Sequence, residues 1–79
     1  MPDKTKKDLV QSVVFKRPEW SKSEAIEWLK HNGYYHDSID TKPHQLRFRQ
    51  LNPEDLTDYH YITKPLKNDV SLIIAIKSN

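Results

Sequence analysis

The segment from Ser21 to Gly33 constrains the fold more than any other part of the chain, because it carries the signals for both ends of a helix. Ser21 is followed three residues later by Glu24, which is the pattern of a capping box. The apolar residues that share one helical face after this cap are Ala25, Ile26, Trp28 and Leu29. Gly33, the only glycine, stands where a helix needs a left-handed residue to end. The spacing predicts a helix over residues 22–32, with Trp28 in the core and Trp20 packed against the helix start.

Runs of β-forming residues predict a sheet around this helix. The expected strands are residues 10–15, 35–41, 45–51, 61–63 and 70–76, and a short second helix is expected over 53–58 after the N-cap Asn52. Pro65 limits the 61–63 strand to an edge, because proline has no N–H to donate. The run 70–76 has apolar residues at both odd and even positions, so both faces of this strand are expected to be covered. This predicts a central strand with Ile74 in the core. The expected fold is α+β: a small, mostly antiparallel sheet with one main helix packed on one face and a second short helix (β-α-β-β-α-β-β order).

The chain has 79 residues, which is room for one domain. Residues 1–8 are charged and contain Pro2, so they are predicted to form a flexible arm, and residues 9–79 are predicted to form a single α+β domain. No run of about 18 apolar residues is present, and the N-terminal residues lack the apolar region of a secretory signal. With no cysteine, these features predict an intracellular or intravirion protein, neither secreted nor in a membrane.

The run Gln45–Leu51 alternates in a way that predicts a two-sided strand. Phe48 is expected to point to the core, while Arg47 and Arg49 project together from the opposite face, about 7 Å apart along the strand. Two guanidinium groups at this spacing can bind carboxylates of an acidic protein segment or adjacent phosphates of a nucleic acid. Alternatively, the face is merely solvated, with Asp37 or Asp40 neutralising the arginines across the sheet.

Tyrosines extend this candidate binding surface. Those able to offer stacking surfaces are Tyr34, Tyr35, Tyr59 and Tyr61. The predicted binding residues are Arg47, Arg49, Tyr34 and Tyr35. A protein partner is favoured over nucleic acid, because the formal net charge is only +2 and no aromatic-rich RNA-binding strand is present. The alternative is a small nucleic-acid-binding protein that uses the Lys-rich arm together with the arginine pair.

Catalytic and metal-binding patterns are not evident in the sequence. One glycine cannot form a phosphate-binding loop, and no serine stands in a nucleophile elbow. The four histidines, at 31, 36, 44 and 60, match no two-ligand helical spacing even with Asp37 or Asp40 nearby. The sequence therefore predicts no enzyme activity, no catalytic residue, no metal and no cofactor.

Several short motifs resemble a small uncharacterised domain of tailed bacteriophages, where it is sometimes joined to prohead proteases, and of large DNA viruses. The motifs, within residues 12–77, are Val13-Val14-Phe15, Trp20-Ser21, Ala25-Ile26, Trp28-Leu29, Gly33-Tyr34 and Arg47-Phe48-Arg49-Gln50. The chain departs from the pattern at Gln45-Leu46, where the domain has an aromatic residue, and it carries no protease domain. The resemblance implies a viral or phage-type accessory or virion-associated protein without known chemistry. The expected function is therefore that of a protein-interaction module, with the partner and the oligomeric state left open.

Overall fold

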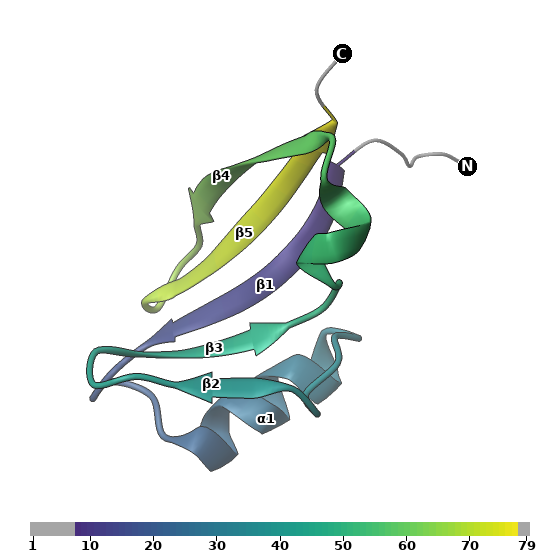
Figure 1. Cartoon of the computed structure of the whole chain (residues 1–79). Coiled ribbons are helices and arrows are strands. Elements are labelled where there is room, and N and C mark those ends of the chain that lie inside the picture. The colour runs from purple at the N-terminus through teal and green to yellow at the C-terminus, as the bar shows by residue number, and fades with distance from the viewer. Residues whose placement is uncertain (1–7, 78–79) are drawn as a thin grey trace.

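Figure 1 shows the computed structural model of the chain, which describes residues 8–77. Within this range five strands form one antiparallel sheet, accompanied by an α-helix and a short 3-10 helix. In chain order the elements are β1 (Asp8–Lys16), α1 (Lys22–His31), β2 (Ile39–Thr41), β3 (Gln45–Arg49), η1 (Pro53–Leu56), β4 (Tyr59–Pro65) and β5 (Val70–Lys77). This arrangement confirms the predicted α+β class. Of the predicted arm, residues 1–7 lie outside the described residues, and Asp8 already belongs to β1.

The strand order β2-β3-β1-β5-β4 places the first and last strands side by side in the middle of the sheet. All neighbouring strands run antiparallel. β3 and β4 follow one another in the chain but lie on opposite sides of the β1–β5 pair, with η1 in the connection between them (Figure 1). β4 forms one edge of the sheet, as Pro65 predicted, and β2 forms the other.

The predicted capping box is present at the start of α1. The Ser21 hydroxyl accepts a hydrogen bond from the Glu24 N–H at 3.3 Å, and the Glu24 carboxylate accepts one from the Ser21 N–H at 3.0 Å. The Ser21 backbone N–H and, to a smaller extent, the Ser21 hydroxyl donate to the Glu24 carboxylate. Both bonds favour its charged form and so lower the pKa of Glu24 below its ordinary value. The helix ends at His31, one residue earlier than predicted, and Gly33 adopts the left-handed φ of 77°.

One core lies between α1 and the face of the sheet that α1 covers, here called the helix-side face. Its buried members are Val13, Phe15, Ala25, Leu29, Leu46, Phe48, Val70, Leu72 and Ile74, which confirms Ile74. Phe15 is the centre of its aromatic part, with ring centroids 5.0 Å from Trp20, 5.5 Å from Trp28 and 5.6 Å from Phe48. The prediction for Trp28 needs a correction, because this side chain is only half-buried at the margin of the core, where it stacks on Tyr34.

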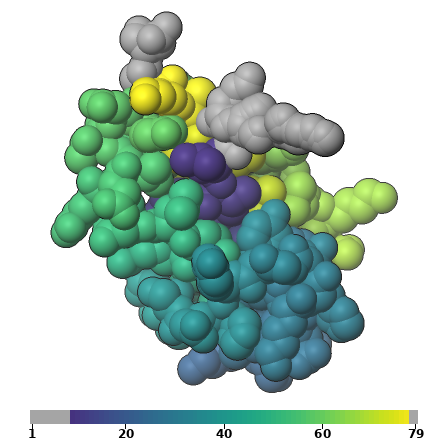
Figure 2. Space-filling view, turned by 90° about the vertical axis from the view of Figure 1, so that its right-hand side faces the viewer, coloured from purple at the N-terminus to yellow at the C-terminus, as the bar shows by residue number. Residues whose placement is uncertain are grey.

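The opposite face of the sheet, here called the open face, carries a different set of side chains. By strand register these are Ser12 and Val14 of β1, Arg47 and Arg49 of β3, Ser71, Ile73 and Ala75 of β5, and Tyr59, Tyr61 and Thr63 of β4. Figure 2 shows the segment that contains η1, in green, on one side of the purple start of β1, and residues from the end of α1, in blue, on the other. Leu56 of η1 is buried but lies outside the main core. Elsewhere the open face is only partly covered by the described residues, since Val14, Ser71 and Ile73 are half-buried and Thr63 is exposed.

Two local predictions were wrong in their extent. The strand expected over 35–41 is limited to β2, because the Gln50 side chain bonds both the N–H (2.7 Å) and the C=O (2.8 Å) of Tyr35 in place of a strand neighbour. The helix expected over 53–58 is a single 3-10 turn that ends at Leu56, since β4 begins at Tyr59. Trp20, next to the start of α1, makes two contacts that the sequence did not predict. It packs on Phe15, and it donates its indole N–H to the Asn68 carbonyl at 2.6 Å, which holds the β4–β5 turn.

Candidate functional site

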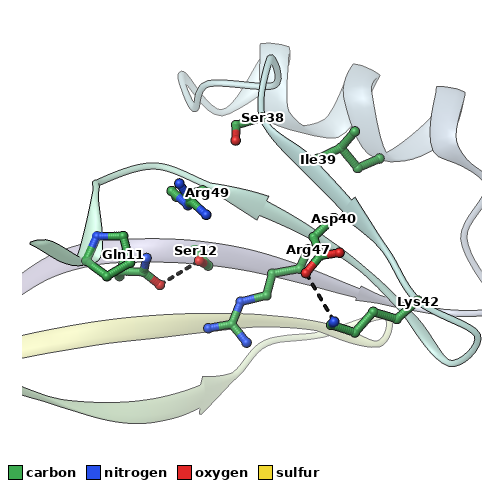
Figure 3. A pocket seen from close by; sticks show the side chains of 9 residues that line it. Gln11, Ser12, Ser38, Ile39, Asp40, Lys42, Arg47 and Arg49 are labelled. Atoms are coloured by element: carbon green, nitrogen blue, oxygen red, sulfur yellow. Dashed lines mark hydrogen bonds and ion pairs between the residues drawn. The ribbon is translucent and has the colours of Figure 1, made fainter.

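β3 places the predicted arginine pair on the open face. Phe48 lies opposite Val13 in the register and is fully buried on the helix-side face. Arg47 and Arg49 flank it in the strand and therefore point to the other side, as the alternation predicted. Arg47 is half-buried and Arg49 is exposed. Figure 3 shows both side chains rising from the same face of β3.

The arginines line an open hollow of about 490 Å³. The residues around it are Gln11, Ser12, Ser38, Ile39, Asp40, Lys42, Arg47, Arg49 and Pro53, drawn from β1, β2, β3, η1 and their connections. Three of these side chains are cations and one is a carboxylate, which leaves two uncompensated positive charges. A hollow with this lining favours an anionic ligand.

Asp40 does not neutralise the arginines, although it stands opposite Arg47 in the register. Its carboxylate pairs instead with the Lys42 ammonium at 3.1 Å, as the dashed line in Figure 3 shows. Asp37, the other predicted partner, lies 3.9 Å from the His36 ring. Among residues 8–77, no carboxylate is within ion-pair distance of either guanidinium. Both groups are therefore available to a carboxylate or phosphate from outside the described part of the chain.

Gln11 and Ser12 form the floor of the hollow, and sequence reasoning missed them. The ladder between β1 and β5 shifts its register between Val10 and Ser12, so Gln11 is the extra residue of a β-bulge. Both side chains are buried, and the Ser12 hydroxyl donates to the Gln11 amide oxygen at 2.6 Å. The Gln11 amide in turn donates to the Leu51 carbonyl at 3.0 Å. Two successive polar residues inside an apolar strand were the sequence signal for this feature.

The two tyrosines predicted as binding residues lie away from the arginine pair. Tyr34 stacks on Trp28 with ring centroids 5.8 Å apart, so it borders the core on the helix-side face. Tyr35 is exposed and follows α1, where its backbone is held by Gln50. The tyrosines that share the open face with the arginines are instead Tyr59 and Tyr61, on the far edge strand.

The histidines are spread over the fold. His31 ends α1, His44 lies in the β2–β3 turn and His60 lies on β4. Over residues 8–77, no three His, Asp or Glu side chains converge as metal ligands.

The chain has no significant match among known family models, curated proteins or solved structures. The resemblance to a phage and viral domain therefore stays a prediction of the sequence motifs. No helix in the described range is long and apolar enough to cross a bilayer.

Proposed function

We propose that this protein is a non-enzymatic protein-interaction module, and that it binds an acidic segment of a partner protein through Arg47 and Arg49 on the open face. The observation that carries the proposal is that Arg47 and Arg49 project from the same face of β3, with no carboxylate partner among residues 8–77. Arginine forms bidentate bonds with carboxylates, and two such bonds combine affinity with a fixed orientation. A viral accessory or virion-associated role stays a prediction of the sequence resemblance.

The spacing of the pair favours an extended acidic segment. Alternate residues of a β-strand lie about 7 Å apart on one face, and this holds for Arg47 and Arg49 as well as for any extended ligand. A peptide with carboxylates at every second position therefore matches both guanidinium groups at once. Nucleic acids bind with useful affinity at physiological salt through roughly six to ten phosphate contacts, which is more than one arginine pair supplies.

The polar groups of the hollow support binding rather than catalysis. The Ser12 hydroxyl is engaged by the Gln11 amide, which cannot act as a general base. The only carboxylate in the lining, Asp40, is paired with Lys42 and its side chain is 61% exposed. Ser12 is buried but its partner cannot activate it, and Asp40 lacks the burial that an acid–base residue needs.

A nucleic-acid ligand is the second candidate, and one observation favours it. Tyr61 is 44% exposed and shares the open face with Arg47 and Arg49. A single strand that crossed the sheet from β3 to β4 would meet cations on β3 and an aromatic ring on the edge strand β4, which is the combination that binds unpaired bases.

The two candidates are separated by a titration with fluorescent ligands at about 150 mM salt. The ligands are a peptide of alternating Glu and Ser, a peptide of the same composition with its Glu residues in one block, and random single-stranded DNA and RNA. We expect the alternating peptide to bind most tightly and the Arg47→Glu/Arg49→Glu variant to lose that binding. The matched control is Lys22→Glu/Lys67→Glu, which makes the same charge change at two exposed positions outside the open face.

The protein-binding proposal is rejected if the alternating peptide shows no advantage over the blocked one, or if the control variant loses binding equally. Tighter binding of DNA or RNA with a steep salt dependence, lost in the arginine variant alone, replaces it with the nucleic-acid candidate.

A further inference from the structure

The free edge of β4 carries a row of backbone groups that no described strand pairs. Leu66 donates its N–H to the Val70 carbonyl at 2.7 Å, and the register continues with Lys64 opposite Leu72 and Ile62 opposite Ile74. In an antiparallel ladder the bonded positions alternate, so the even-numbered residues of β4 bond to β5. Tyr59, Tyr61 and Thr63 consequently direct their N–H and C=O groups away from the sheet. Pro65 is also at one of these outward-facing positions, but proline has no N–H, so only its carbonyl faces outward.

The two edges of the sheet differ in how they are protected from pairing. β2 is only three residues long, and the Asp40–Lys42 ion pair places two charges beside it. β4 has seven residues and runs without a bulge in its register to β5. Its charged residue, Lys64, and its proline lie together at one end. Short length, charges and bulges are the usual protection of an edge strand, and the part of β4 from Tyr59 to Thr63 has none of them.

The side chains of β4 support an interface as well. The large apolar or aromatic residues that are exposed in the described chain are Tyr35, Tyr61, Ile62 and Leu66, and three of these four lie on β4 or directly after it. Tyr61 points to the open face and Ile62 to the helix-side face. A strand added to this edge would therefore cover apolar surface on both sides of the sheet.

We infer that two copies of this chain associate through β4, pairing antiparallel around a two-fold axis at Tyr61. Pro65 has no N–H to donate, so the segment able to pair is Tyr59–Thr63, and Tyr61 is its central residue. In this register Tyr59 of each copy lies opposite Thr63 of the other, and Tyr61 lies opposite its own symmetry mate. All outward N–H groups of the segment then find a carbonyl across the two-fold axis. The inference is independent of the proposed function.

Charge complementarity favours a second copy over a peptide of another protein. The same register places Asp58, the exposed residue before β4, opposite Lys64 of the second copy, and the symmetry repeats this pair at the other end. Opposite charges across neighbouring strands stabilise their pairing. No like charges meet, because the two Lys64 side chains stand at opposite ends of the paired segment.

The geometry has a defined consequence for the surface. An antiparallel pair keeps directly opposite side chains on the same face of the sheet, so both open faces lie on one side of the joined sheet. Tyr59 and Tyr61 of the two copies form a row of four aromatic rings at the seam. The arginine pairs lie on either side of this row.

Sedimentation velocity of the full chain between about 10 and 500 µM tests the inference, since an interface of this small size is expected to be weak. Thr63→Pro removes an outward N–H while leaving the bonds to β5 in place, and we expect it to weaken dimerisation at least about tenfold. Thr63→Val is the matched control, because it keeps the N–H and the β-branched shape, and we expect it to dimerise like the parent chain. Far-UV circular dichroism establishes that each variant is folded.

A charge exchange gives a second test that does not depend on proline. Lys64→Glu places two carboxylates opposite each other and is expected to weaken dimerisation several-fold, and the double variant Asp58→Lys/Lys64→Glu is expected to restore it. The inference is overturned if the parent chain is monomeric at the highest concentration, if folded Thr63→Pro dimerises as well as Thr63→Val, or if the double variant is no tighter than Lys64→Glu alone.

Discussion

A substitution of Phe15 by alanine removes the side chain on which the aromatic part of the core converges. Phe15 is fully buried, and its ring lies 5.0–5.6 Å from the rings of Trp20, Trp28 and Phe48. A buried Phe→Ala change costs about 3–5 kcal/mol, because apolar contacts are lost and a cavity remains. At about 0.05–0.15 kcal/mol per residue, a chain of 79 residues has a total stability of about 4–12 kcal/mol. The variant should therefore lose a large part of its stability.

The assay is urea unfolding followed by far-UV circular dichroism, because Trp20 and Trp28 both touch Phe15 and make fluorescence an ambiguous probe. Phe15→Leu keeps most of the volume and removes the ring pairs, so we expect it to cost about 1–2 kcal/mol. Val14→Ala, the neighbouring half-buried residue on the open face, is the control and should cost less than Phe15→Ala. A loss below about 1 kcal/mol for Phe15→Ala, or equal losses for Phe15 and Val14, would refute this packing scheme.

Four further predictions use the same unfolding assay. Gly33→Val should lower the free energy of unfolding by about 1–2 kcal/mol, and Gly33→Asn by less. The φ of Gly33 is 77° and an added Cβ meets no atom within 4 Å, so backbone strain is the only cost; equal losses for the two variants would contradict this. Ser21→Ala should cost about 1 kcal/mol through the lost cap. Folding lowers the pKa of Glu24, so the charged carboxylate stabilises the folded state. The difference in unfolding free energy between the parent chain and Glu24→Ala should be present above the ordinary pKa of 4.5 and should vanish as the pH falls through the lower folded pKa. A difference that does not change with pH would exclude this contribution. Trp28→Ala should cost less than Phe15→Ala, about 2 kcal/mol, because Trp28 is half-buried.

Local signals in the sequence predicted the elements that depend on neighbouring residues. The Ser21–Glu24 box and Gly33 delimit a helix through bonds within a few positions, and the alternation around Phe48 fixes the face of both arginines. Pro65 identified the edge strand for an equally local reason, since its missing N–H excludes it from a central position.

Long-range contacts decided what the sequence did not predict. Tyr35 lies outside β2 because Gln50, fifteen positions later, occupies its backbone groups. Tyr34 was assigned to the binding surface, but stacking on Trp28 holds it at the core margin. The floor of the hollow depends on a bulge at Gln11, which becomes evident only from the pairing of β1 with β5.

The central position of the β1–β5 pair has a consequence for how the chain reaches its native state. Phe15 lies opposite Val70 and Asp8 opposite Ile76, so the pairing at the middle of the sheet joins positions more than fifty residues apart. Closing so long a loop costs chain entropy before any contact compensates it, and topologies of this kind fold more slowly than those built from local pairings. α1 and the β2–β3 hairpin can form early from local interactions. During synthesis, however, the core stays incomplete until β5 has left the ribosome. Until then the strands already made expose apolar surface and an unpaired edge of β1, through which unfinished chains can associate.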